Sequence, residues 1–114
     1  MSRIPIRVAS PTKYYSRRTD DGYASKREAK RAAELRLLQS GREIFDLQEQ
    51  VRIELLPACP SLGYRRAVEY WADFQYKDDL GILHTEDAKG YPTAVYKLKK
   101  RLLAQLKGII IEEV

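Results

Sequence analysis

The spacing of the apolar residues changes from a helical period to a period of two in the middle of the chain. Residues 25–38 are rich in good helix formers and in small alanines, which allow a helix to pack closely on a sheet. Residues 50–55 then alternate strictly between polar and apolar, and residues 67–76 carry apolar side chains at the even positions. Because a strand turns successive side chains to opposite faces, this alternation predicts two half-buried strands beside a helix.

Cap and turn residues predict where these elements begin and end. Ser25 and Glu28 form the S-x-x-E pattern of a capping box, and Gly41 is placed to end the first helix. The segment Asp79-Leu80-Gly81 predicts a three-residue hairpin loop between the second strand and a third strand over residues 82–89.

A second helix is expected from its cap at Thr93 to Lys107, followed by a strand over residues 109–114. The apolar residues of this helix are spaced as one stripe: Val95, Leu98, Leu102 and Leu106. The order helix, three strands, helix, strand predicts an α/β or α+β sandwich in which helices cover a mixed sheet.

The length of 114 residues is that of one domain. We expect residues 1–24 to form a basic arm and residues 25–114 to form the domain, because only the second range has sustained periods. A composition of 44% hydrophobic and 32% charged residues is that of a soluble globular protein. No stretch approaches the ~20 apolar residues of a membrane span, and the first residues lack a hydrophobic signal core. A cytoplasmic protein without membrane contact is therefore expected.

Residue counts exclude several kinds of active site. Cys59 and His84 are each the only residue of their type, which rules out cysteine zinc clusters and sites that need two histidines. The sequence has no Gly-x-Ser-x-Gly elbow and no glycine-rich phosphate loop. If the protein is an enzyme, carboxylates and lysine must carry its chemistry.

The formal net charge of +5 and a pI near 9.4 raise the expectation of a polyanionic partner. Solvated helix faces explain the same charges equally well, so charge alone does not decide between the two interpretations. If the partner is DNA, the basic residues expected to contact it lie in the arm and at the two helices: Lys13, Arg17, Arg18, Lys26, Arg27, Lys97 and Lys100.

Two aspartates on neighbouring strands form the centre of a candidate site. A three-residue loop at 79–81 would place Asp73 directly opposite Asp87, with their Cβ atoms about 4.5–5.5 Å apart. Two such carboxylates repel each other unless a proton or a cation lies between them, and Mg²⁺ prefers oxygen ligands. Alternation puts Lys89 on the same side as Asp87, where it could orient the attacking water. Glu86 points to the other side and is expected to be dispensable.

Each residue of this group also has a simpler interpretation. An Asp-x-Lys sequence at a strand end is usually a pair of exposed polar residues when nothing else accompanies it. Glu28, as the fourth residue of a capping box, could serve only to bond back to the Ser25 amide. The two roles of Glu28 do not exclude each other, and the sequence leaves both open.

Taken together, however, these residues resemble the PD-(D/E)XK nuclease superfamily. Within it, the chain is similar to a phage-encoded group of small uncharacterised proteins, over roughly residues 13–110. Five stretches in order carry the resemblance: Lys13-Tyr14, Ser25-Lys26-Arg27-Glu28-Ala29, Ala72-Asp73-Phe74, Glu86-Asp87-Ala88-Lys89-Gly90 and Tyr96-Lys97-Leu98-Lys99-Lys100. Position 72 holds Ala where the superfamily name has Pro, a change that removes no ligand.

The resemblance implies a restriction-endonuclease-like αβββαβ core and phosphodiester cleavage that depends on Mg²⁺, with Mn²⁺ able to substitute. It implies that Asp73 and Asp87 are metal ligands, that Lys89 positions water, and that Glu28 is a ligand or an acid supporting the ligands. Gln50 lies where related proteins often carry a glutamine on the first strand, and it is a further candidate for contact with DNA. Small relatives include Holliday-junction resolvases, which act as dimers on branched DNA.

These implications lead to one leading function and two alternatives. We expect a Mg²⁺-dependent DNA endonuclease, resolvase-like and homodimeric, acting in the cytoplasm of a bacterial host if it is encoded by a phage. The first alternative is a non-catalytic nucleic-acid-binding module that retains the nuclease fold, against which the set Asp73, Asp87 and Lys89 argues. The second is a protein-interaction domain whose positive charge is incidental. Shared fold alone does not choose among them.

Overall fold

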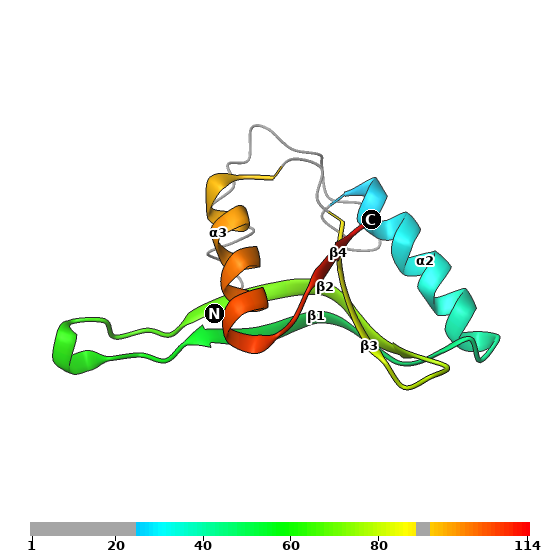
Figure 1. The fold of residues 1–114 in the computed structure, drawn as a ribbon. Helices are drawn as coiled ribbons and strands as arrows, with labels where there is room; N and C mark the ends of the chain where they lie inside the picture. Colours follow the sequence, from blue (N-terminus) through cyan, green and yellow to red (C-terminus); the bar gives the residue numbers. More distant parts are fainter. Residues whose placement is uncertain (1–24, 89–91) are drawn as a thin grey trace.

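The computed structural model describes residues 25–88 and 92–114, and it shows an α+β fold (Figure 1). The expected order of elements is confirmed from the first helix onward. Two short turns accompany the regular elements, a 3₁₀ turn at Pro60–Leu62 and a π-helical turn at Leu103–Lys107. The regular elements are α2 (Lys26–Ser40), β1 (Ile44–Leu56), β2 (Val68–Asp78), β3 (Leu83–Asp87), α3 (Ala94–Leu102) and β4 (Ile111–Glu113). The predicted basic arm, residues 1–24, and Lys89 lie outside the described residues.

The four strands form one mixed sheet in the order β1-β2-β3-β4. Strand β2 is antiparallel to both β1 and β3, and β4 runs parallel to β3. The parallel pair follows from the topology, because the chain crosses over through α3 before it returns to the edge of the sheet. This confirms the predicted mixed sheet.

Helix α2 begins and ends where its cap residues predict. The Ser25 hydroxyl accepts a hydrogen bond from the Glu28 backbone N–H at 3.1 Å, and Gly41 follows the last helical residue. The buried side of α2 presents Ala32 and Leu35, which have no exposed surface. These residues pack against Ile44, Phe74 and Tyr76 of the sheet, so one part of the core joins α2 to β1 and β2.

Strand β1 is longer than the sequence indicates, because it begins at Ile44 rather than at Gln50. Asp46 and Gln50 adopt positive φ angles of 56° and 57°, and the pairing of β1 with β2 shifts between Phe45 and Gln48. A bulge adds a residue to one strand and interrupts the alternation of side chains. The first half of β1 therefore lacks the period of two that identifies a strand.

Helix α3 turns a different side to the core than its aliphatic spacing predicts. Val95, Leu98 and Leu106 are 50–58% exposed, whereas Tyr96 and Leu103 are buried. Tyr96 and Leu103 pack with side chains of β1, β2 and β4 in the second part of the core. The prediction that the aliphatic stripe faces the core is thus wrong for these three residues, whereas Leu102 is partly buried against the core. Tyr96 takes a core position instead, because tyrosine buries its ring while its hydroxyl keeps a polar partner.

The two helices lie on opposite faces of β3 and β4. Arg31 of α2 contacts Glu86 on β3, whereas Tyr96 of α3 contacts Glu113 on β4, which is the register partner of Asp87. Because neighbouring residues of a strand face opposite sides, Glu86 and Asp87 are turned toward different helices. In Figure 1, β3 and β4 accordingly rise between α2 and α3 from the long hairpin of β1 and β2. Among the described residues, no helix is long and apolar enough to cross a membrane.

Candidate active site

The hairpin between β2 and β3 has the predicted three-residue loop. The Asp78 amide donates to the Ile82 carbonyl at 3.0 Å, and Gly81 adopts a φ of +81°, which glycine accommodates without strain. The register pairs Phe74 with Glu86 and Lys77 with Leu83. Continued by one residue, this register places Asp73 opposite Asp87. The predicted register is therefore confirmed.

Both aspartates are buried, Asp73 with 1% and Asp87 with 0% of their surface exposed. The Asp73 carboxylate accepts a hydrogen bond from the Ala88 backbone N–H at 2.9 Å, which fixes it next to the end of β3. Burial of ionised carboxylates is costly, and two of them on facing positions raise that cost further. Buried carboxylates on facing positions are common at functional sites, so this pair is the centre of the candidate site.

Glu28 reaches the sheet through Gln50. The Glu28 side chain is 2% exposed, and its Oε2 accepts a hydrogen bond from Gln50 Nε2 at 2.8 Å. The pairs on either side of Gln50, Glu49 with Phe74 and Val51 with Ala72, place Gln50 across from Asp73. Glu28 therefore takes part in the helix cap through its backbone amide. Its carboxylate contacts Gln50, which lies across from Asp73.

The donor set of the site suits a hard cation. Within residues 25–88 and 92–114, no group of three or more His, Cys, Asp or Glu side chains has the spacing of a metal site. Mg²⁺, however, is usually held by one or two carboxylates and keeps several waters. Asp73 and Asp87 supply two carboxylates from adjacent strands, which meets that smaller requirement. The assignment of Glu28 as a third ligand stays a prediction, as do the roles of Lys89.

Glu86 has a structural role that the sequence does not reveal. It points away from the aspartates, as predicted, but it is 1% exposed and accepts two hydrogen bonds of 2.7 Å from the Arg31 guanidinium. The Tyr76 hydroxyl donates a third hydrogen bond to it. The hydrogen bond to Glu86 is the main reason for the raised pKa of Arg31, whereas burial comes first for the raised pKa of Tyr76. Glu86 therefore joins α2 to β3, and the expectation that it is dispensable for the site stays a prediction.

Glu113 and Tyr96 lie beside the candidate site, and sequence reasoning did not place them there. Glu113 is the register partner of Asp87 in the parallel pair, and the Val114 amide donates to the Asp87 carbonyl at 3.1 Å. The Tyr96 hydroxyl donates to Glu113 Oε2 at 2.6 Å. Burial, this hydrogen bond and the charge of Asp87 raise the pKa of Tyr96, so its hydroxyl stays protonated. No local pattern marks Glu113, because only the register of β4 brings it beside Asp87.

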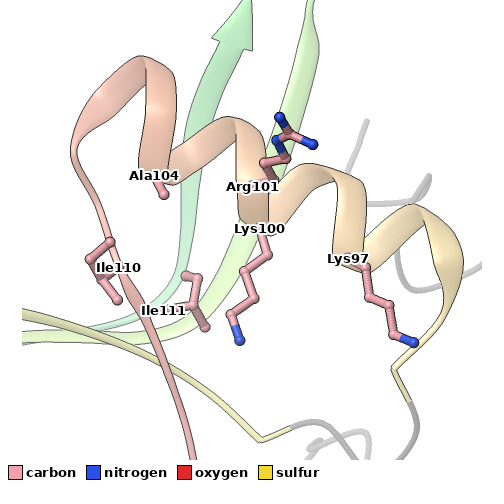
Figure 2. Close-up of a pocket in the computed structure, with 6 residues that line it drawn as sticks. All are labelled: Lys97, Lys100, Arg101, Ala104, Ile110 and Ile111. Carbon is pink, nitrogen blue, oxygen red and sulfur yellow. The ribbon is translucent and has the colours of Figure 1, made fainter.

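The predicted DNA-binding residues occupy several positions. Lys26 and Arg27 lie exposed in the first turn of α2, and Gln50 lies in the site. Lys97 and Lys100 of α3 line a pocket of about 300 Å³ with Arg101, Ala104, Ile110 and Ile111 (Figure 2). The predicted contacts Lys13, Arg17 and Arg18 lie outside the described residues.

The fold and the paired aspartates thus define a small α+β domain with a buried acidic centre on its sheet. Residues 12–109 match the family described as "Protein of unknown function (DUF1064)", and the chain belongs to this family. Comparisons with curated proteins and with solved structures found no match.

His84 lies outside this centre and makes the stability of the fold depend on pH. Its Nε2 is 2.8 Å from Asp78 Oδ2, its Nδ1 is 2.7 Å from Glu112 Oε2, and its ring stacks on Tyr76. The hydrogen bonds to Asp78 and then Glu112 raise the pKa of His84 above its ordinary value of 6.5. A raised pKa in the folded state means that the charged histidine stabilises the fold fully below the unfolded pKa. This contribution is lost as the pH rises through the folded pKa.

We therefore expect the melting temperature to fall as the pH is raised from about 6 through the folded pKa of His84. Measuring melting temperatures from pH 5 to 9 for the wild type and for His84→Gln tests this. In His84→Gln the decrease should be absent within that window. An identical decrease in both proteins would show that another group causes it.

Proposed function

We propose that the protein is a metal-dependent endonuclease that hydrolyses phosphodiester bonds of DNA, with branched or recombination intermediates as substrates. One observation carries the proposal: Asp73 and Asp87 are buried on facing positions of adjacent strands. A non-catalytic DNA-binding protein gains nothing from opposed carboxylates near phosphates, because they repel the ligand. The resemblance to PD-(D/E)XK nucleases supports the same conclusion.

In this proposal Asp73 and Asp87 hold Mg²⁺, with Glu28 as a further ligand or as an acid that supports the ligands through Gln50. The cation would lower the pKa of a bound water and offset the negative charge that develops on the phosphate. The residues of the chain provide the geometry. The Ala88 amide fixes the orientation of Asp73, the three-residue loop fixes the register of Asp87, and Lys89 would orient the attacking water.

The test is a cleavage assay on linear duplex, single-stranded and four-way-junction DNA with Mg²⁺, Mn²⁺ or EDTA. The wild type should cut with either metal and lose all cleavage with EDTA, while Lys89→Ala should cut much more slowly and still bind DNA. Lys107→Ala removes the same type of charge from the exposed end of the π-helical turn and serves as the matched control. Unchanged cleavage by Lys89→Ala would refute the assignment of this site. DNA binding without cleavage under any metal would favour the non-catalytic module.

We also propose that the protein acts as a homodimer in the cytoplasm. One small domain offers little surface for a large branched substrate, and a dimer presents two sites to two strands. The exposed side chains Val95, Leu98 and Leu106 give α3 an apolar surface that a second copy would cover. Sedimentation of the wild type should show a dimer that Leu98→Asp converts to a monomer. A wild-type protein that is monomeric at every concentration tested would contradict this proposal.

A further inference from the structure

A hydrogen-bonded lysine lies beside the acidic centre, on the face that α3 covers. Lys100 Nζ donates a hydrogen bond to Glu113 Oε2 at 2.9 Å, and the same oxygen accepts the Tyr96 hydroxyl at 2.6 Å. Glu113 is in turn the register partner of Asp87. Three side chains from α3 and β4 therefore form one hydrogen-bonded group next to a site aspartate.

The contacts of this group favour one placement of the Lys100 ammonium. A lysine side chain on a protein surface ordinarily samples many rotamers, and fixing it costs conformational entropy. Here Tyr96 is buried, so its hydroxyl anchors the Glu113 carboxylate, and that carboxylate then holds Lys100. The hydrogen bonds from Tyr96 and from Lys100 also lower the pKa of Glu113, which keeps it ionised. An ammonium group has three donors, so two remain after the bond to Glu113.

Lys100 has a second lysine as a neighbour on the same side of α3, and two ammonium groups can share one phosphate group. Lys100 lines a largely apolar pocket of about 300 Å³ together with Lys97 and Arg101, with Ile111 of β4 and the preceding Ile110 among the other lining residues (Figure 2). Lys97 and Lys100 extend in the same direction from α3 in Figure 2. The next lysine, Lys99, is turned the other way and donates to the Glu69 carbonyl at 2.9 Å. Of the basic residues of α3, Lys97, Lys100 and Arg101 line the pocket, whereas Lys99 does not.

We propose that Lys100 and Lys97 form a phosphate-binding subsite for the DNA strand beside the cleaved bond, and that Glu113 and Tyr96 are positioning residues that hold Lys100 there. This inference rests on the proposed function for the identity of the polyanion. It deepens that function by assigning the side of the site along which the substrate backbone runs. Successive residues of a helix are rotated by about 100°, which places the subsite on nearly the opposite side of α3 from the exposed side chains Val95, Leu98 and Leu106. A DNA strand and a second copy of the chain can therefore contact α3 at the same time.

Binding of a duplex or junction DNA in EDTA, measured across a range of salt concentrations, tests the subsite without requiring cleavage. Each phosphate contact adds about 0.9 to the slope of log K against log salt concentration. Lys100→Ala should therefore lower this slope by about 1, and Lys100→Arg should keep it. Glu113→Gln should lower the slope as well, and Tyr96→Phe should do so to a smaller extent, because each releases Lys100.

The Glu113→Gln result separates positioning from general electrostatics. This variant removes a negative charge, so a glutamate that merely lies near the DNA would, when replaced, give tighter binding and an unchanged slope. A positioning glutamate gives weaker binding in spite of the more positive net charge. Tighter binding by Glu113→Gln, or an unchanged slope in Lys100→Ala, would overturn the proposal.

Arg36→Ala is the matched control, because Arg36 also forms a helix-to-strand ion pair, with Glu49 at 2.8 Å. It lies on α2, across β3 and β4 from α3, so its removal should leave the slope unchanged. A slope that falls equally in Arg36→Ala and Lys100→Ala would show a diffuse charge effect and no subsite. Circular dichroism of each variant shows that the fold is retained.

The outcomes also separate this inference from the proposed nuclease activity. If the wild type cleaves DNA and every α3 variant keeps the full salt dependence of binding, the nuclease function stands and the subsite is refuted. If the wild type cleaves nothing but Lys100→Ala lowers the slope, the subsite stands and belongs to a non-catalytic DNA-binding protein. A wild type that does not bind DNA at all would refute both.

Discussion

Replacing Asp87 by asparagine should reduce Mg²⁺-dependent cleavage by about 10³-fold or more while leaving the fold intact, because a metal ligand supplies several kcal/mol of transition-state stabilisation. Asparagine matches aspartate in shape but carries no charge, so it cannot hold the cation as tightly. The same change removes one of two like charges that are buried on facing strands. The melting temperature should therefore stay the same or rise, which is the behaviour expected of a residue kept for function.

Cleavage of junction DNA and thermal unfolding, measured on the same preparations, check both halves of this prediction. Asp79→Asn is the matched control, because it makes the same substitution at the exposed hairpin loop and should leave cleavage unchanged. DNA binding by Asp87→Asn should persist, since a neutral side chain repels phosphates less. A lower melting temperature together with full cleavage would show that Asp87 is structural.

Replacing Glu86 by alanine should lower the free energy of unfolding by about 3 kcal/mol, because removing one partner of a buried ion pair costs about 3–5 kcal/mol. The lower end applies here, since the Arg31 side chain is 25% exposed and water can solvate part of its charge. The variant also leaves the Tyr76 hydroxyl without its acceptor Glu86. For a domain of this size, the melting temperature should fall by roughly 10 °C.

Glu34→Ala provides the control, because Glu34 pairs with the same arginine at 3.1 Å but is 46% exposed at its side chain. An exposed pair of this kind contributes only about 0.2–1 kcal/mol, so this variant should unfold at nearly the wild-type temperature. Denaturant titration of both variants measures the difference. Below its melting temperature Glu86→Ala should still cleave DNA, in contrast to Asp87→Asn. Equal stability losses in the two glutamate variants would contradict the assigned role of Glu86.

The parts of the fold that follow from local chemistry could be predicted from the sequence. The cap at Ser25, the end of α2 at Gly41 and the three-residue loop at 79–81 each depend on a few neighbouring residues. The loop in turn fixes the facing positions of Asp73 and Asp87, because pairing along a hairpin is determined by its turn. The centre of the candidate site was therefore predictable without knowledge of the tertiary structure.

The remaining features depend on contacts between distant segments. The side of α3 that faces the core is determined by Tyr96, whose ring packs near Tyr70 and whose hydroxyl reaches Glu113. An aliphatic spacing rule does not include such a residue. Likewise, the ion pair between Arg31 and Glu86 joins residues 55 positions apart, which no local pattern reveals. The position of Glu113 beside Asp87 requires the parallel pairing of β4, which only the assembled sheet provides.

The hairpin loop Asp79–Gly81 has a consequence for how this protein can vary. An insertion of a single residue into an exposed loop is ordinarily harmless. Here it would threaten the register, and a shift by one residue would turn Glu86 toward the acidic centre and Asp87 toward Arg31. Insertions of two residues would preserve the alternation, whereas single insertions would put Glu86 in the place of Asp87, the proposed metal ligand. The length of a solvent-exposed turn, far from any reacting atom, is thus part of the information that specifies the site.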